Sequence, residues 1–333
     1  MILLIVIASL LFLLLCGATY QAIGEARDRR RFPPPGRLVN ASGKRWHIIE
    51  SGRGGPAVVF ESGLAASCLN WTRVREEVAL FARACAYDRA SLGWSDTAKP
   101  PRVASTLVAE LHAVLAAAQI APPYVLVGHS FGGLLVGMFA ANHPEEVVGL
   151  VLIDPLLASE WLKPSEAQMR MRGRGVRLAR RGALLARFGV VRFALKLFTG
   201  GARRVPQAIA RVTSSGSGES QISRLVGEVG KMPREVWPMV TTHWCLPKSF
   251  EGLAAALEAL PHSSAEAASL VLPASIPLTI LSAANSTPAQ RAEREALAKR
   301  SVRGQHLVAA KSGHWIHLDE PALVVDAIRD LIR

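Results

Sequence analysis

The sequence predicts an α/β fold in which a mostly parallel sheet is covered by helices on both faces. Apolar runs typical of buried strands alternate with amphipathic helical segments over residues 57–153, and this alternation resumes over residues 277–333. Residues 156–272 are helical in composition and contain no clear strand. The first 24 residues carry no charged side chain, and this length is sufficient for a helix that spans a bilayer.

The chain is expected to contain five parts: a transmembrane anchor (1–24), a linker (25–36), the first part of the α/β core (37–155), a helical cap (156–272) and the second part of the core (273–333). A short antiparallel pair is expected at residues 37–40 and 44–50, followed by buried strands at 57–60, 84–87, 124–128, 147–153, 277–281 and 305–309. Helices are expected at 103–118, 131–142 and 288–300, the last of them a charged surface helix. Asp319 is expected to cap a final helix with Pro321 in its first turn.

The charges that follow the apolar N-terminal run bear on where the protein resides. Four arginines come directly after this run, at positions 27, 29, 30 and 31. A secretory signal normally carries its positive charge before the apolar run, so this order favours an uncleaved single-pass anchor. Secretion after cleavage behind Ala18 or Gly24 is the alternative. The positive-inside rule then places the arginines and the following domain on the cytoplasmic side.

The net charge of +13 favours acidic partners. Twelve Lys/Arg and two acids lie between Glu160 and Arg204, and residues 176–198 form a basic amphipathic pattern. This pattern is either a solvated helix face or a cap surface that lies on anionic lipid. No nucleic-acid-binding motif accompanies the charge. The four cysteines are widely spaced, so we expect no metal site and no disulfide framework, and nothing indicates a cofactor.

A G-x-S-x-G pattern at residues 128–132 lies between an apolar strand and a helix that begins with small residues. A serine at such a turn is forced onto a sharp elbow, and the flanking glycines let strand and helix approach without a Cβ clash. Ser130 is therefore the candidate nucleophile. The backbone N–H of Phe131, at the helix start, faces the same space and is a candidate oxyanion donor.

A serine hydroxyl needs a base to act as a nucleophile at neutral pH. His314 is the best candidate because it follows the last strand, at the edge of the sheet where Ser130 is expected. His317 is the rival, but its alternation with apolar neighbours indicates packing. The other histidines are interpreted as packed residues (His129 and His306) or as surface or core residues without a motif (His47, His112, His143, His243 and His262).

The third member of such a site is a carboxylate that fixes the imidazole tautomer, and the chain order Ser, Asp, His places it between Ser130 and His314. The loop at residues 282–287 contains no carboxylate, whereas Asp154 follows its strand directly. We therefore predict that Asp154 is the acid; its alternative role is to cap the helix that opens the insertion. Asn285 and Glu293 are less favoured candidates for the role of the acid.

A second oxyanion donor is expected in the loop Glu61-Ser62-Gly63-Leu64, where the N–H of Leu64 is the candidate. The alternative is an ordinary strand-to-helix turn. Asp88 and Arg89 follow the next strand. They are either a catalytic carboxylate with a substrate clamp or a structural ion pair that holds their loop, and we favour the ion pair.

These motifs resemble those of the cap-bearing α/β-hydrolases, a group that includes esterases, lipases, haloperoxidase-like and epoxide-hydrolase-like enzymes. The resemblance covers residues 38–154 and 278–333, and it implies an eight-stranded sheet with a lid inserted after the sixth strand. Epoxide hydrolases and haloalkane dehalogenases of this family carry aspartate at the elbow, so Ser130 argues against both activities. The family's acid usually follows the seventh strand, and Asp154 fits the members that place it after the sixth. The resemblance rests on residues 61–63, 87–95, 128–133 and 312–314.

The sequence therefore predicts a membrane-anchored serine hydrolase that cleaves carboxylic esters through an acyl-enzyme. An apolar lid near a bilayer favours lipophilic acyl substrates, and the expected partners are a small-molecule or lipid ester and the membrane itself. Acyl transfer, thioester cleavage and amide cleavage use the same groups and remain alternatives. The third hypothesis is a protein of this fold that binds a lipid or a protein partner without catalysis. The intact Ser130 and His314 argue against it.

Overall fold

The computed structural model describes residues 1–199 and 230–333, so residues 200–229 of the predicted cap lie outside the described residues. Contacts within the chain divide it into two compact units. The first unit comprises Met1–Pro33 and Arg174–Ala254, and the second comprises Pro34–Gly173 and Ala255–Arg333. Residues 156–173, which the sequence assigns to the cap, group with the sheet.

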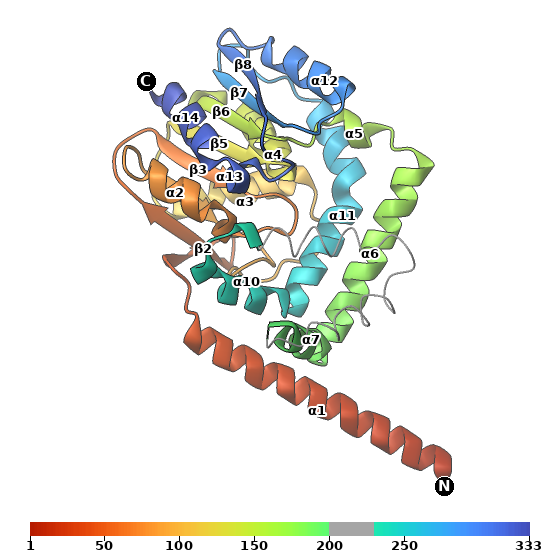
Figure 1. Cartoon of the computed structure of the whole chain (residues 1–333). Coiled ribbons are helices and arrows are strands. Elements are labelled where there is room, and N and C mark those ends of the chain that lie inside the picture. The colour runs from red at the N-terminus through yellow and green to blue at the C-terminus, as the bar shows by residue number, and fades with distance from the viewer. Residues whose placement is uncertain (200–229) are drawn as a thin grey trace. The chain divides into compact units, whose positions relative to one another are not determined.

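An eight-stranded sheet forms the centre of the second unit (Figure 1). Its strands are β1 (Arg37–Ala41), β2 (Lys44–Ser51), β3 (Ala57–Glu61), β4 (Ala84–Tyr87), β5 (Tyr124–His129), β6 (Val147–Ile153), β7 (Leu278–Ala283) and β8 (Gly304–Ala309). The strand order is β1-β2-β4-β3-β5-β6-β7-β8. β2 pairs antiparallel with β1 and β4, and all other pairs are parallel. The predicted fold class is confirmed.

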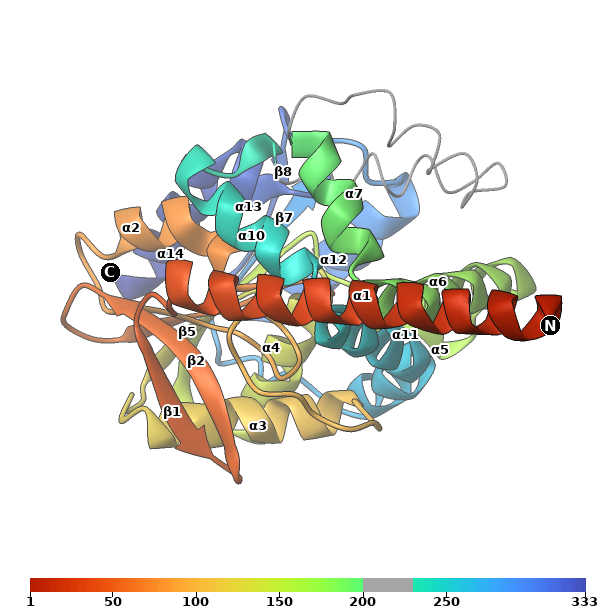
Figure 2. The ribbon, with the colours of Figure 1, turned by 90° about the horizontal axis from the view of Figure 1, so that it is seen from below.

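Helices pack on both faces of this sheet (Figures 1 and 2). α2 and α14 contact each other and cover one face, α3 and α4 contact each other and cover the other, and α12 packs on β7 and β8. The helices that lie wholly within this unit are α2 (Thr72–Val78), α3 (Ala104–Ala117), α4 (Phe131–Asn142), α5 (Ser159–Leu162), α12 (Pro288–Ala298), α13 (Ile316–Asp319) and α14 (Pro321–Ile332), with short 3₁₀ turns η1 (Cys68–Trp71) and η2 (Pro144–Glu146).

The centre of the sheet is buried on both faces, which explains why its strands read as continuous apolar runs. Every residue of β3, β4, β5 and β7 is buried, whereas the edge strand β8 is mostly exposed or half-buried. Because β3 and β5–β8 are parallel, their carboxyl ends lie at one edge, and loops that leave this edge come together there. Ser130, Asp154 and His314 all follow such strands.

The first unit contains α1 (Ile2–Arg31), α7 (Val190–Thr199), the 3₁₀ turn η3 (Arg234–Val236), α10 (Trp237–Trp244) and parts of α6 (Glu166–Arg187) and α11 (Pro247–Ala268). α1 is long and apolar enough to cross a bilayer, and length and composition of this kind fit an anchor and a signal sequence alike. The helix extends through residues 25–31, which the sequence assigns to a linker. Its buried Gln21 donates a hydrogen bond to the Cys245 carbonyl, and Arg192 pairs with Asp28.

The end of the chain departs from the predicted helix cap. Glu320, and not Asp319, occupies the N-cap position of α14, although Pro321 lies in the first turn as expected. Asp319 ends the preceding helix, α13, and its carboxylate accepts a hydrogen bond from the Ser312 hydroxyl at 2.9 Å. A one-turn helix therefore separates the loop after β8 from α14.

The first prediction concerns Gly128, near the end of β5, and Gly137, within α4. A Cβ at Gly128 would lie 2.5 Å from the Gly132 carbonyl oxygen, whereas a Cβ at Gly137 meets nothing within 4 Å. Gly128→Ala is therefore expected to lower the free energy of unfolding by about 1–3 kcal/mol through overpacking. Gly137→Ala, the matched control within the helix, should raise it by up to about 1 kcal/mol because alanine favours the helix. Thermal unfolding of the detergent-solubilised chain measures both, and equal shifts of the two variants would contradict this account.

Candidate active site

Ser130 occupies a strained turn between β5 and α4. Its backbone angles, φ 55° and ψ −120°, lie in a region that side-chain-bearing residues rarely adopt. A Cβ at Gly132 would run into the Glu61 carbonyl oxygen, so the helix start packs directly on the end of β3. Elbow strain of this kind persists because the surrounding backbone holds it, and it turns the serine side chain out of the sheet.

Asp154 and His314 lie in contact although 160 positions separate them in the chain. Asp154 follows β6 directly, and His314 lies in the loop after β8. The Asp154 Oδ2 and the His314 Nδ1 are 2.6 Å apart. A carboxylate accepts hydrogen bonds, so the proton of the neutral imidazole resides on Nδ1 and Nε2 remains free to accept one.

Two opposed effects set the pKa of the Asp154 carboxyl group. Burial raises the pKa of the carboxyl group, but the hydrogen bond with His314 and the positive charge of Arg294 outweigh burial and lower it. The second oxygen, Oδ1, accepts hydrogen bonds from Arg294 Nη1 at 2.6 Å and from the Ala283 N–H at 3.1 Å. The carboxylate is therefore both ionised and fixed in orientation.

Arg294 was not found by the sequence analysis, which assigned residues 288–300 to a charged surface helix. The structure buries this arginine on α12, where it also donates from Nη2 to the Pro155 carbonyl oxygen at 3.1 Å. The sequence feature that could have indicated burial is the four-residue spacing between Arg294 and Ala298, which places both side chains on one face of the helix. In the structure this is the face that is buried.

His129 and the His314 loop lie side by side at the elbow. The His129 Nε2 is 2.9 Å from the His314 carbonyl oxygen, and the two rings are 4.6 Å apart between centroids. Burial, followed by the neighbouring His317 and His314, lowers the pKa of His129 well below its usual value, so this ring is neutral. His317 is buried as predicted, and its ring lies 4.6 Å from the Trp71 ring between centroids at an angle of 32°.

The hydroxyl of Ser130 makes no hydrogen bond within the part of the chain that the structure describes. The side chain of His314 is 43% exposed and retains its contact with Asp154. Serine–histidine contacts often tighten only when substrate binds. The lack of a Ser130–His314 hydrogen bond in this structure is therefore compatible with His314 as the base. Among the described residues, neither of the less favoured candidates for the acid makes a hydrogen bond or ion pair with His314. Asn285 is exposed, and the Glu293 carboxylate accepts a hydrogen bond from the Ser159 hydroxyl.

The two candidate oxyanion donors border the elbow. A Cβ at Gly63 would lie 3.5 Å from the Ser130 Cβ, which places the loop after β3 beside the serine. Among the described residues, neither the Leu64 N–H nor the Phe131 N–H donates a hydrogen bond to the protein. Both groups therefore remain candidate oxyanion donors, and in this structure Phe131 is buried.

An apolar groove runs beside the elbow helix. Its volume is about 360 Å³, and its wall includes Gly133 and Pro155, which are close neighbours of Ser130 and Asp154 in the chain. The remaining wall is mainly aliphatic and includes Leu134, Met138, Leu156, Leu270 and Leu272. A groove with this lining suits a hydrocarbon group.

Comparison with known proteins agrees with this fold. A family model described as alpha/beta hydrolase fold matches residues 56–321, and the chain belongs to this family. The uncharacterized protein YqjL of Bacillus subtilis is 36% identical over 110 residues, which are 32% of this chain and 42% of YqjL. The chain thus matches less than half of that relative's length.

Solved structures of hydrolases share the fold over most of the chain. A thermophilic esterase from Thermogutta terrifontis has a TM-score of 0.59 at 19% identity, covering 89% of this chain and 97% of the esterase. The epoxide hydrolase CorEH has a TM-score of 0.62 at 16% identity, with the same coverage. Because both chemistries occur on one fold, the similarity establishes the fold, and the reaction has to be argued from the site.

The second prediction concerns the pair Arg294–Asp154. Arg294→Met removes one partner of a buried ion pair and is expected to lower the free energy of unfolding by about 3–5 kcal/mol. The pKa of Asp154 is lower in the folded protein than in the unfolded chain, so the ionised carboxylate stabilises the fold at pH values above the unfolded-state pKa. This stabilisation is lost as the pH falls through the folded-state pKa. Without Arg294 this loss should begin at a higher pH, so acid unfolding should shift upward.

The control for this prediction is Lys299→Met, which removes an exposed partner of Glu295 next to the same helix. Exposed pairs of this kind contribute at most about 1 kcal/mol. Circular dichroism over an acid titration measures both variants. An Arg294→Met protein whose acid unfolding matches that of Lys299→Met would contradict the assigned role of the arginine.

Proposed function

We propose that the protein is a serine hydrolase that cleaves carboxylic esters. The single observation that carries the proposal is the 2.6 Å contact between Asp154 Oδ2 and His314 Nδ1 at the sheet edge to which the elbow brings Ser130. A histidine whose Nδ1 proton is fixed by a carboxylate presents Nε2 as a base, and a base next to a serine is what hydroxyl activation requires.

In the proposed mechanism, Ser130 attacks the ester carbonyl as His314 takes its proton. The Leu64 and Phe131 N–H groups stabilise the negative charge that develops on the carbonyl oxygen. His314 then protonates the leaving alcohol, which leaves an acyl group on Ser130. Water, deprotonated by His314, attacks the acyl-enzyme, and the released acid and free serine complete the cycle. Asp154 orients the imidazole and stabilises its cation throughout.

A serine at the elbow separates this reaction from the aspartate-dependent chemistry of epoxide hydrolases and haloalkane dehalogenases in the same family. The aliphatic groove beside α4 supports a lipophilic acyl or alcohol group in the substrate. Hydrolysis of esters is also the activity named for the Thermogutta terrifontis enzyme of the same fold.

The third prediction tests the nucleophile directly. The full chain in detergent is incubated with a fluorophosphonate probe, which reacts with activated serines, beside Ser130→Ala and Asp154→Asn. We expect labelling of the parent, none of Ser130→Ala, and about 10⁴-fold slower labelling of Asp154→Asn, because the amide favours the wrong tautomer. Ser286→Ala, which removes a hydroxyl that also contacts Asp154, is the matched control and should label normally.

Labelling that survives in Ser130→Ala would exclude this mechanism. A folded parent that does not label, and hydrolyses no ester, would instead favour a protein that binds a lipid or a partner without catalysis.

We further propose that α1 anchors the protein in a membrane and that the basic helix α6 lies on anionic lipid. The run before Gln21 is aliphatic and almost entirely exposed, and arginines occupy the last turn of the helix. On α6 and α7, arginines alternate with exposed apolar side chains, among them Leu184, Leu185 and Phe193. This combination is typical of helices that lie in the headgroup layer.

The fourth prediction separates an anchor from a signal sequence. An anchored chain should stay in membranes washed with alkaline carbonate, and its N-terminal peptide should be intact by mass spectrometry. Replacement of Leu10 and Leu11 with arginine should release it to the soluble fraction, since each charge in the hydrocarbon costs about 2.5–3.5 kcal/mol. A soluble parent whose N-terminus begins after Ala18 or Gly24 would show cleavage and contradict the anchor.

A further inference from the structure

We propose that Arg89 is a positioning residue for the oxyanion hole. Its guanidinium fixes the direction of the Leu64 N–H and contacts the residue that carries the second donor, Phe131. This inference rests on the proposed serine-hydrolase function, because these N–H groups have a catalytic role only if Ser130 attacks a carbonyl carbon.

The guanidinium of Arg89 is buried and makes three hydrogen bonds to the end of β3 and the loop that follows it. Its Nη1 donates to the Glu61 carboxylate and, at 2.6 Å, to the Ser62 carbonyl oxygen. Its Nη2 donates to the Gly63 carbonyl oxygen. A planar group with donors on two nitrogens holds two successive peptide units at once, which a lysine ammonium does not do with the same geometry.

The contact with Gly63 determines where the Leu64 N–H points. In a trans peptide the carbonyl of one residue and the N–H of the next point in opposite directions. Because the Gly63 oxygen faces Arg89, and also accepts the Ala66 N–H at 3.3 Å, the Leu64 N–H is directed away from the arginine. A flip of this peptide would remove the donor and would have to break both hydrogen bonds.

The loop needs such a restraint because its own backbone is strained. Ala65 adopts φ 57°, in the left-handed region that is unfavourable for a residue with a Cβ. Strain of this kind persists only when surrounding contacts determine the conformation. The guanidinium of Arg89 supplies two of these contacts at Ser62 and Gly63.

The same guanidinium also contacts the other donor residue. The Arg89 Cζ lies 5.8 Å from the centroid of the Phe131 ring, which is fully buried. This distance is within the range of cation–π attraction. One side chain therefore contacts both segments that carry the candidate oxyanion donors, the loop after β3 and the first residue of α4.

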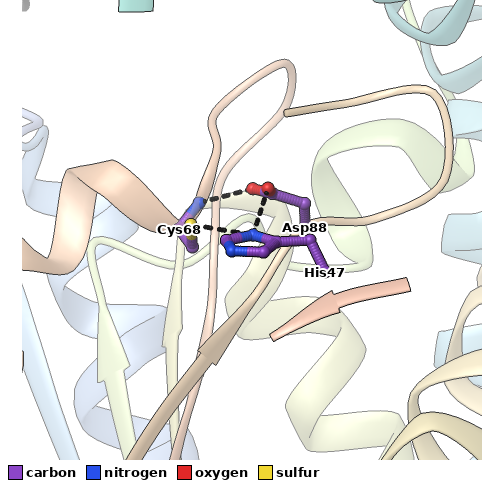
Figure 3. Close-up of side chains that lie close together, drawn as sticks. All are labelled: His47, Cys68 and Asp88. Atoms are coloured by element: carbon purple, nitrogen blue, oxygen red, sulfur yellow. Dashed lines mark hydrogen bonds and ion pairs between the residues drawn. The ribbon is translucent and has the colours of Figure 1, made fainter. Parts of the chain in front are cut away.

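Asp88, the neighbour of Arg89, holds the far end of the same loop (Figure 3). Its Oδ1 accepts the Cys68 N–H at 2.9 Å, and its Oδ2 lies 2.8 Å from His47 Nδ1. Burial, and then Asp88, raise the pKa of the Cys68 thiol well above its usual value, so the sulfur is a neutral thiol. The close approach of His47, Cys68 and Asp88 is thus that of a hydrogen-bond network.

These contacts correct the predicted ion pair between Asp88 and Arg89. The two side chains do not pair with each other: Asp88 pairs with His47, and Arg89 pairs with Glu61. Together they hold the last and the first residues of the loop 62–68, which belongs to a different strand connection from their own.

The test compares Arg89→Lys with Arg102→Lys in the full chain in detergent. Arg102 is the matched control because it is similarly buried and pairs through both Nη atoms with Glu110, at 2.6 and 2.5 Å, and not with the loop 62–68. Four quantities are measured: the melting temperature, the fraction of sites that a fluorophosphonate finally titrates, the kcat and KM for a p-nitrophenyl ester, and inhibition by a trifluoromethyl ketone. The adduct of this ketone with serine carries an oxyanion.

Arg89→Lys should lower kcat per titrated site about 10–100-fold, approaching the loss of one oxyanion donor. The KM should change less than about threefold, because the ground-state carbonyl uses the hole weakly. Inhibition by the ketone should weaken by the same factor as kcat. Arg102→Lys should show a comparable fall in melting temperature with kcat per site within about twofold of the parent.

Two outcomes would overturn the inference while leaving the proposed function intact. One is an Arg89→Lys protein with a parental kcat per titrated site, and the other is a kcat loss without a matching loss of ketone inhibition. A parent that neither labels nor hydrolyses esters would overturn the proposed function and this inference with it. If Arg89→Lys does not fold, Glu61→Gln is measured in its place. In this variant the Arg89 guanidinium keeps its two carbonyl partners and loses its anionic partner, so kcat should fall about 3–10-fold. An unchanged kcat would contradict the proposal.

Discussion

The hydrogen bond between the Asp154 carboxylate and the His314 imidazole is the interaction on which the rest of the site depends. It joins the carboxyl end of β6 to the loop after β8, and it assigns the imidazole proton to Nδ1. The parallel order β5-β6-β7-β8 makes this contact possible, because it brings chain segments 160 residues apart to one edge. The Ser130 elbow leaves the same edge from β5, so the proposed nucleophile, base and acid share a rigid support.

Two buried arginines organise the surroundings of this contact. Arg294 holds the oxygen of Asp154 that does not face His314, and Arg89 holds the loop that carries the Leu64 N–H. Burying a guanidinium is unfavourable unless its charge is paired, and both arginines meet a carboxylate and at least one backbone carbonyl. Such groups determine geometry more than stability, which fits their place behind the proposed acid and behind the proposed oxyanion hole.

The sequence predicted the strands and the elbow because both are local patterns. Continuous apolar runs indicated strands covered on both faces, and the glycines around Ser130 indicated a turn that permits close approach. Asp154 and His314 were predicted from the chain order Ser, Asp, His and from their places directly after predicted strands. The partners of Arg89 and Arg294 could not be predicted, because a buried charge pairs with whatever the tertiary fold brings to it, and α12 reads as a surface helix. Asp319 was placed wrongly as a cap, since a one-turn helix before α14 has no sequence signal of its own.

The most direct test of the central claim is to trap the acyl-enzyme. The full chain is mixed with a p-nitrophenyl ester, quenched in acid within the first turnover, and digested for tandem mass spectrometry. The account predicts that the acyl group is found on Ser130 and that its appearance is much slower in Asp154→Asn, because that variant loses the imidazole tautomer that accepts the serine proton. Rapid turnover with no acyl group on Ser130, or with the acyl group on another residue, would contradict it.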